Sequence, residues 1–484
     1  MKKQFIMMAV ALLTAGMMTT ACSNDDVAIE NPTEQTSKGD MLFTATIAPK
    51  DGTTRSVSEG GVTTWVENEQ IAVYYQKTDD SYATATANVD AVNEGKATIS
   101  ATLSDAKNGG TVKFVYPASL VDATGDDIDE TKLKSNQHGT IADISANFDA
   151  ATASAILKTN GTTCGTTETI AFTNQVLIGK FTPKFGETAI DGITSLTISD
   201  GSTYSYNVTP TSGTFGTEGI YVAMLPVDDE EVIISAQTAS QRYGYGGKKI
   251  TLTKGKLYNN LAIPMLKVHN LSSGSFNANE DAFIYQRGIM DPSNTITISA
   301  GHKVILSNVN ISTGDNNAIA CSGNADIILS GSSTVKNNSV NKAVIKAGPA
   351  ATTLTISGAG SIDAQAIYSS PTINAAVIGS DGSDESDADV TCGNISITGG
   401  IIWASFANSS YGAAIGTGRN GTCGTINITG GTINAYRNTS DATTYDIGKG
   451  NGGTTGTVTI AASVQTSDGK HYTSGDAAHG YNKE

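Results

Sequence analysis

The residues best suited to chemistry in this 484-residue chain occupy equivalent positions of a C-terminal repeat. Three segments align as Ile-X-Ala, and their middle residues are Asp363, Trp403 and Asn434. Because successive strand residues point to opposite faces, the Ile and Ala side chains should point inward and the middle residues outward. An indole face flanked by a carboxylate and an amide is typical of sugar binding. Tyr411 and Tyr436, in the loops that follow, would extend this strip. The alternative is that a neighbouring loop covers the tryptophan.

A second concentration of oxygen ligands lies in residues 381–389. Asp381, Asp384, Asp387 and Asp389 are weak candidates for Ca²⁺, which prefers several carboxylate or carbonyl oxygens. Their spacing differs from that of an EF-hand loop, so a solvated acidic loop is the alternative interpretation. The histidines show no paired spacing typical of zinc. We therefore expect no cofactor.

Apart from Cys22, the chain has four cysteines, and they allow three disulfide pairings. They are Cys164, Cys321, Cys392 and Cys423. Cys392 and Cys423 stand at the same position of two successive repeats, CGNISITGG at 392–400 and CGTINITGG at 423–431, which makes a bond between them conceivable. Small buried thiols are the commoner explanation.

The elements that must position these residues are short strands that recur from residue 267 to residue 484. Apolar-X-apolar triplets recur, and a second phrase, which ends in Ile and in its later copies in Ile-Gly, recurs out of step with them; the repeats are about 26–41 residues long. One such repeat cannot bury its apolar face alone, so stacking must supply the core. The region is predicted to be a right-handed parallel β-helix with coils ~4.8 Å apart. It resembles carbohydrate-binding β-helix modules of secreted proteins.

The part before residue 267 alternates apolar and polar residues in short runs separated by turn-rich segments. This pattern predicts two β-sandwiches, over residues 41–160 and 161–266. Residues 148–158 fit either a short helix or a connector. The whole chain is therefore predicted to be all-β.

Composition supports an extracellular protein that does not bind nucleic acid. The chain has 30 Lys plus Arg against 46 Asp plus Glu, a net charge of −16, and such a surface repels phosphate backbones. Thr, Ser, Asn, Gly and Ala are abundant, which favours strands and turns over cytosolic helical architecture.

The first residues are a targeting segment. A basic start and an apolar run form a predicted signal peptide over residues 1–21, and the stretch before Cys22 resembles a bacterial lipobox. The resemblance implies acylation of Cys22, and residues 22–40 are polar and read as a tether. The two adjacent acidic residues shortly after Cys22 resemble signals that direct lipoproteins to the outer face of the outer membrane. An ordinary signal peptide is the alternative.

Several short segments of the N-terminal half, in order and spacing, resemble the fimbrillin family of type V pilus subunits. They are residues 43–47, 54–55, 65–74, 114–117, 170–175, 221–226 and 254–258. The resemblance implies two fimbrillin-like (transthyretin-like) β-sandwiches. It also implies that an arginine-specific protease cuts after Arg55, which makes Ser56 the first residue. The alternative is that Arg55 is a solubilising surface residue.

Loss of strand 41–48 would leave an apolar groove that a strand of a neighbouring subunit can fill. In the family the C-terminal segment is the donor, whereas here residues 261–264 continue into a domain of over 200 residues. The sequence thus predicts a tip or accessory adhesin of the fimbrium that contacts other pilus subunits, a surface glycan or glycoprotein, and the outer membrane. The alternatives are a non-polymerising surface glycan-binding lipoprotein and, less favoured, a β-helix polysaccharide lyase or hydrolase. We expect no enzymatic activity.

Overall fold

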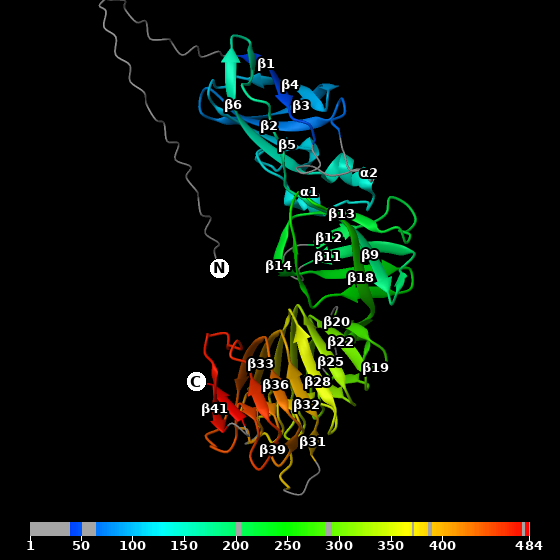
Figure 1. The fold of residues 1–484 in the computed structure, drawn as a ribbon, viewed down its shortest axis with the longest axis vertical. Helices are drawn as coiled ribbons and strands as arrows, with labels where there is room; N and C mark the ends of the chain where they lie inside the picture. The colour runs from blue at the N-terminus through cyan, green and yellow to red at the C-terminus, as the bar shows by residue number, and fades with distance from the viewer. Residues whose placement is uncertain are drawn as a thin grey trace, which may run out of the picture.

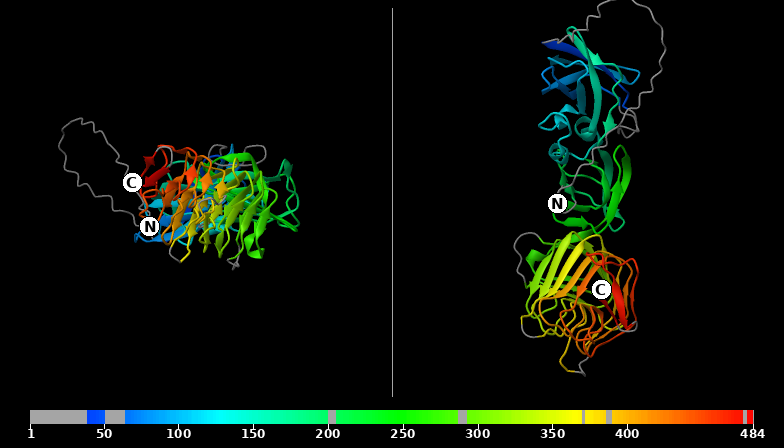
Figure 2. Two further views of the ribbon diagram at one scale, coloured as in Figure 1. Left: turned by 90° about the horizontal axis from the view of Figure 1, so that it is seen from below. Right: turned by 90° about the vertical axis from the view of Figure 1, so that its left-hand side faces the viewer.

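The computed structural model describes the chain in seven stretches and is built almost entirely of strands. The described residues are 39–50, 64–199, 205–286, 293–369, 372–385, 390–476 and 480–483. Three parts follow one another along the long axis: an N-domain (β1–β8), an M-domain (β9–β18 with the short helices of residues 118–148) and a coil domain (residues 271–483) (Figures 1 and 2). The predicted all-β class is confirmed.

The N-domain is one sheet that closes on itself. Its strands run in the order β5-β2-β3-β4-β1-β7-β6-β8, and β5 also pairs with β6. The strands are β1 (Asp40–Ile47), β2 (Gln70–Gln76), β3 (Tyr82–Asn93), β4 (Lys96–Ser104), β5 (Thr111–Tyr116), β6 (Ala151–Asn160), β7 (Thr163–Thr166) and β8 (Thr173–Asn174). The predicted sandwich of this part is thus a single folded-over sheet.

The predicted boundary between residues 160 and 161 is wrong in both directions. The strands β7 and β8 pair within the N-domain, and Phe172 is buried in the N-domain core. Conversely, the short helices η1 (Ala118–Leu120), α1 (Glu130–Lys134), α2 (Ile141–Asp143) and η2 (Ile144–Phe148) precede β6, and Leu133 and Phe148 pack into the M-domain core. Residues 151–160 form a strand, so the expected helix or connector over 148–158 is corrected as well.

Two sheets of the M-domain share one long strand, β18 (Leu257–Asn270), and β14 and β17 form a separate antiparallel pair. The first part of β18 pairs in parallel with β9, which also holds β10 and β13, and its later residues pair with β16 in the sheet β12-β11-β15-β16. The other strands are β9 (Leu177–Phe185), β10 (Thr188–Ala189), β11 (Ile193–Ser199), β12 (Ser205–Val208), β13 (Ile220–Met224), β14 (Val227–Glu231), β15 (Ile233–Thr238), β16 (Arg242–Tyr245) and β17 (Lys249–Leu252).

The coil domain consists of parallel ladders in which equivalent strands of successive turns lie side by side (Figure 1). The first is β20 (Ala282–Tyr285), β22 (His302–Ser307), β25 (Ala325–Ser330), β28 (Thr353–Gly358), β32 (Asn394–Ile397), β36 (Ile426–Ile428) and β40 (Val458–Ile460). The second is β19 (Phe276–Ala278), β21 (Ile296–Ile298), β24 (Ile319–Cys321), β27 (Ile345–Lys346), β30 (Ile378–Gly379), β34 (Ile415–Gly416) and β38 (Ile447–Gly448). The third is β23 (Asn310–Thr313), β26 (Ser332–Asn337), β29 (Ser361–Ala366), β33 (Ile401–Phe406) and β37 (Thr432–Tyr436).

A short fourth ladder and a terminal hairpin complete the coil domain. The ladder is β31 (Thr391–Cys392), β35 (Thr422–Cys423) and β39 (Thr454–Thr455), and the hairpin of β41 (Tyr472–Asp476) and β42 (Gly480–Lys483) pairs antiparallel with β38. Inward-facing Ile, Val and Ala side chains of successive turns form one continuous core. The right-handed winding of a β-helix stays a prediction.

The M-domain and the coil domain are joined by a continuous sheet. The last residues of β18 pair in parallel with β20, so the M-domain sheet leads directly into the first ladder. Outward residues of that ladder are apolar where the M-domain covers them: Gly244 lies against Phe283, and Gly247 lies against Ile328. The Glu231 carboxylate accepts hydrogen bonds from the backbone N–H of Gly247 at 2.7 Å and of Gly331, in the coil domain, at 2.9 Å. The two parts are therefore tied by main chain and side chain together.

Candidate functional site

The third ladder presents the predicted strip on its outer face. Trp403 of β33 is directly opposite Asp363 of β29 on one side and Asn434 of β37 on the other. The flanking Ile402 and Ala404 are fully buried, so the register and the inward and outward directions predicted for these repeats are confirmed. Trp403 is 38% exposed, and the neighbouring coils therefore leave part of the residue open to solvent.

The polar residues beside Trp403 differ in how far they are engaged by the protein. Asp363 accepts a hydrogen bond from Gln365 Nε2 at 2.6 Å through one carboxylate oxygen. Asn434 Oδ1 accepts from the backbone N–H of Ser467 at 3.0 Å and from its hydroxyl at 2.7 Å. Asn434 thus anchors the segment that follows the last coil, and this role reduces what its amide can offer to a ligand.

The aromatic residues predicted to extend the strip separate in the structure. Tyr436 is the last residue of β37, opposite Ser405, and its side chain is 58% exposed on the same face as Trp403. Tyr411 lies elsewhere, at the turn into β34, where the Arg419 guanidinium is 4.5 Å from its ring centroid. The prediction that Tyr411 extends the strip is not supported by any contact with Trp403.

Sequence reasoning missed three further members of the strip. Ile401 is exposed beside Trp403, and Gln365 and Ser405 lie opposite each other two residues along their strands from Asp363 and Trp403. The two-residue alternation that placed Trp403 on the outer face also applies to these positions. The aligned repeats therefore contained the signal that could have found them.

The acidic loop is held by cations rather than arranged around a vacant cation site. Asp381 is buried and accepts hydrogen bonds from Lys346 Nζ at 2.9 Å, Asn317 Nδ2 at 2.9 Å and the backbone N–H of Ala343 at 2.9 Å. Burial alone would raise the pKa of Asp381, but these hydrogen bonds outweigh it and hold the pKa below its ordinary value. Asp381 is therefore an anchor between coils.

The other three candidate Ca²⁺ ligands are Asp384, Asp387 and Asp389. Asp384 pairs with the Arg419 guanidinium, and Asp387 and Asp389 lie outside the described residues. Within the part of the chain that the structure describes, no group of three or more His, Cys, Asp or Glu side chains is placed to hold a metal ion. Asp381 and Asp384, the weak candidates for metal ligands, thus both face protein cations, and Asp381 is buried rather than solvated as the alternative interpretation expected.

The cysteines of two successive coils form a disulfide. Cys392 and Cys423 are bonded across the fourth ladder, with their Cα atoms 4.6 Å apart. The preferred interpretation of small buried thiols is wrong for this pair, because the parallel register places the two residues side by side. It holds for Cys164 and Cys321, which are free and buried, and burial raises their pKa to about 11 and about 12.

The first strand of the chain lies inside the N-domain sheet, not at its margin. β1 pairs antiparallel with β4 over residues 40–47 and in parallel with β7 at residues 42–44. Its inward side chains, Met41, Phe43, Ala45 and Ile47, are all buried in the N-domain core. Removing β1 would therefore expose backbone groups of two strands and an apolar groove between them.

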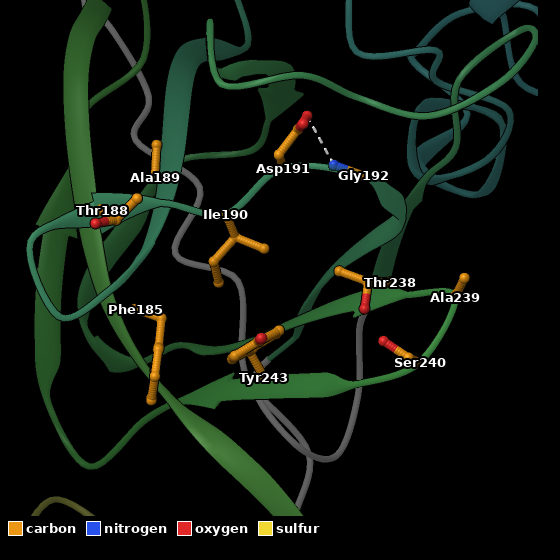
Figure 3. A pocket seen from close by; sticks show the side chains of 10 residues that line it. All are labelled: Phe185, Thr188, Ala189, Ile190, Asp191, Gly192, Thr238, Ala239, Ser240 and Tyr243. Atoms are coloured by element: carbon orange, nitrogen blue, oxygen red, sulfur yellow. Dashed lines mark hydrogen bonds between the residues drawn. The ribbon is translucent and has the colours of Figure 1, made fainter.

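Two of the hollows lined by M-domain residues are the largest there. A cavity of about 510 Å³ lies between the turn of residues 186–192 and the turn of residues 238–243, with Phe185 and Tyr243 at one side and ring centroids 5.6 Å apart (Figure 3). Its one carboxylate, Asp191, accepts the backbone N–H of Gly192 at 2.9 Å. A larger cleft of about 800 Å³ lies at the junction with the coil domain, floored by Ile305 and Ile328. Neither contains an arrangement of groups that indicates catalysis.

No family model matches the sequence, and no curated protein is similar to it. The structure is similar to a fimbrial protein from Bacteroides ovatus (12% identity, 46% of this chain and 50% of that chain, TM-score 0.25). It is also similar to a fimbrial assembly protein from Parabacteroides distasonis (13%, 45% and 88%, TM-score 0.24). A third is the tip fimbrial protein Mfa3 from Porphyromonas gingivalis with a C-terminal truncation (10%, 44% and 92%, TM-score 0.20).

These similarities each cover less than half of this chain, and this chain covers half of the length of the Bacteroides ovatus protein. Similarity of this extent adds no argument about ligand or partner. Cys22, Arg55 and Ser56 lie outside the described residues. Among the described residues, no helix has the length and apolar character needed to cross a membrane.

Proposed function

We propose that this protein is a pilus-associated surface adhesin whose first strand is replaced by a strand of a neighbouring subunit after cleavage at Arg55. The observation that carries the proposal is the position of β1, which pairs with strands on both sides and buries one face in the N-domain core. A strand at this place is both a structural element and a removable one, because the segment that follows it contains the cleavage site.

Release of β1 creates a site of definite chemistry. The groove would offer the unpaired N–H and C=O groups of β4 along eight residues, and pockets that had held Met41, Phe43, Ala45 and Ile47. An incoming strand with apolar residues at alternate positions restores both the hydrogen bonds and the burial. The partners implied are other pilus subunits.

The same chain has no free strand to donate from the end of its M-domain. β18 continues from the M-domain into the pairing with β20, and the coil domain follows. A subunit that accepts a strand and donates none from this position fits the end of a fibre or an accessory place on it. The fimbrium at the cell outer membrane, with a lipid on Cys22 before cleavage, is the location that follows from this proposal.

The coil domain supplies the adhesive part of the proposal. The exposed faces of Trp403 and Tyr436, with Asp363 and Gln365 beside them, suit contact with a surface glycan. Asp363 is the single carboxylate among the outward residues of β29, β33 and β37. Glycosidases use a pair of carboxyl groups, so we propose binding rather than hydrolysis.

The mature N-terminus tests the assembly proposal. Mass spectrometry of protein taken from fibres should find Ser56 as the first residue, and the Arg55→Ala variant should remain uncleaved and absent from fibres. Acylated Cys22 on assembled wild-type protein would contradict the proposal and favour a non-polymerising surface lipoprotein.

The glycan strip is tested separately on the full chain. Trp403→Ala should lower retention on a glycan array at least tenfold, because stacking of a sugar on the indole is lost. Tyr82→Ala, which removes an exposed aromatic residue of the N-domain, is the matched control and should leave retention unchanged. Equal retention by the wild-type protein and Trp403→Ala would refute the strip.

A further inference from the structure

A hollow of about 700 Å³ continues the strip beyond Tyr436. Tyr436 lines it together with Arg437, Asn438, Lys470 and Asn482. Tyr436 is two residues along and one strand across from Trp403, so their Cα atoms are separated by about 8 Å, given ~4.8 Å between strands and ~3.3 Å per residue. One oligosaccharide can therefore contact both rings and reach into the hollow.

Both oxygens of the one carboxylate that lines the hollow already accept hydrogen bonds. Asp446 is buried and accepts the backbone N–H of Arg437 at 2.8 Å through one oxygen and that of Lys483 at 2.8 Å through the other. Lys483 Nζ is paired with Asp468 at 3.1 Å. The Asp446 carboxylate keeps its negative charge, but both of its oxygens are already held by backbone donors. Among the residues that line the hollow, three cations, Arg437, Lys470 and Lys483, therefore stand against this one carboxylate.

Two cations retain their capacity to bind. Arg437 Nη1 donates to the backbone carbonyl of Asp441 at 2.7 Å, which orients the guanidinium without neutralising it. The Asp441 carboxylate itself accepts hydrogen bonds from Thr443 and Asn451. Lys470 Nζ has no ion pair among the residues that the structure describes. The hollow thus has a cationic lining, with Arg437 and Lys470 outside any ion pair of the described residues, on a chain whose net charge is −16.

We propose that this hollow binds the anionic group of an acidic glycan, a sugar carboxylate or sulfate, while the adjoining sugar stacks on Tyr436 and Trp403. The inference rests on the proposed glycan-binding function and adds its ligand class. A guanidinium presents paired N–H donors that match a carboxylate or sulfate, and Lys470 adds a second positive charge. The acidic remainder of the surface repels polyanions, so recognition of such a ligand requires a local cationic site of this kind.

The test measures binding of the full chain to sialyllactose, lactose sulfate and lactose. Wild-type protein should bind at least one of the two anionic sugars about tenfold or more tightly than lactose, and the preference should fall as salt is added. The stronger of the two anionic ligands identifies the source of the charge. Equal binding of all three sugars overturns the inference and leaves the proposed function standing. Binding of none overturns both.

Single-residue variants test whether the preference for anionic sugars arises at this hollow. Arg437→Gln and Lys470→Gln should each abolish most of the preference for the anionic sugar and leave lactose binding unchanged, whereas Trp403→Ala should weaken all sugars alike. Lys470→Arg should retain the preference, which a merely structural role of Lys470 would not require. Lys96→Gln removes one exposed charge from the N-domain and is the matched control. If it lowers the preference as much as Lys470→Gln, the effect is one of overall charge and the inference is wrong.

Discussion

The proposed replacement of β1 by a strand of a neighbouring subunit predicts that two adjacent apolar residues of β1 respond very differently to truncation. Phe43 is fully buried in the N-domain core, whereas Leu42, its neighbour on the same strand, is 55% exposed. Phe43 also contacts Phe114, with ring centroids 6.1 Å apart. Phe43→Ala therefore removes a core contact of β1, and Leu42→Ala changes the same strand without touching the core.

The expected magnitudes follow from burial. Truncation of a buried phenylalanine to alanine destabilises a domain by about 3–5 kcal/mol, because transfer free energy is lost and a cavity remains. Truncation at an exposed position changes stability by about 0.5 kcal/mol or less. After cleavage at Arg55, a loss of about 3–5 kcal/mol should weaken the affinity of the groove for the β1 segment by roughly 100- to 4,000-fold.

The assay uses the full chain cleaved at Arg55 in vitro. A labelled peptide of residues 40–48 should exchange into the cleaved protein, and the Phe43→Ala peptide should compete roughly 100-fold or more weakly than the Leu42→Ala peptide. Hydrogen exchange of the β4 amides should report the same order, since β4 pairs with β1 along its length. Equal competition by the two peptides would refute the reasoning, because the groove would then not recognise the buried face.

Three further predictions concern the coil domain and its junction. Reduction of the Cys392–Cys423 bond, or Cys392→Ala, should lower the free energy of unfolding of the coil domain by about 3–4 kcal/mol for a loop of 31 residues, as denaturant titration with and without reductant would measure. The lowered pKa of Asp381 contributes stability that is present above the ordinary carboxyl pKa and lost as pH falls through the folded pKa. Asp381→Asn should therefore destabilise the coil domain at pH 7 by about 2 kcal/mol and flatten its acid unfolding profile, and an unchanged profile would contradict the assignment. Gly247→Ala should loosen the junction, because its φ is +80° and a Cβ would lie 2.4 Å from Ile328 Cγ2; faster proteolysis between M-domain and coil domain would show it.

Repetition explains why part of the coil domain was predictable from the sequence. The alignment of Asp363, Trp403 and Asn434 required no knowledge of long-range contacts, because equivalent residues of successive coils pair directly. The same alignment of repeats places Cys392 beside Cys423. Free thiols are nevertheless the preferred interpretation from the sequence alone, because small buried thiols are the commoner case. Where the chain repeats itself, sequence order and spatial order coincide.

The N-terminal half offered no such guide. β7 pairs with β1, whose partner residues are about 120 positions earlier, and Cys164 faces Phe43 across that pairing. No local pattern around residues 163–174 indicates which sheet they join, so the boundary was misplaced. The burial of Asp381 could not be predicted for the same reason. Its partners Asn317 and Lys346 come from earlier coils, whereas the acidic composition of its own loop indicates exposure to solvent.

The shared strand β18 has a mechanical consequence. Its first part lies parallel to β9 in the M-domain, and its last part lies beside β20 in the coil domain. Under the proposed function, tension between a fibre and a bound surface would pass along this one covalent strand. The ladder to β9 would then be loaded in shear, with many hydrogen bonds resisting together. In the proposed function, adhesion under load would depend on that strand staying in place.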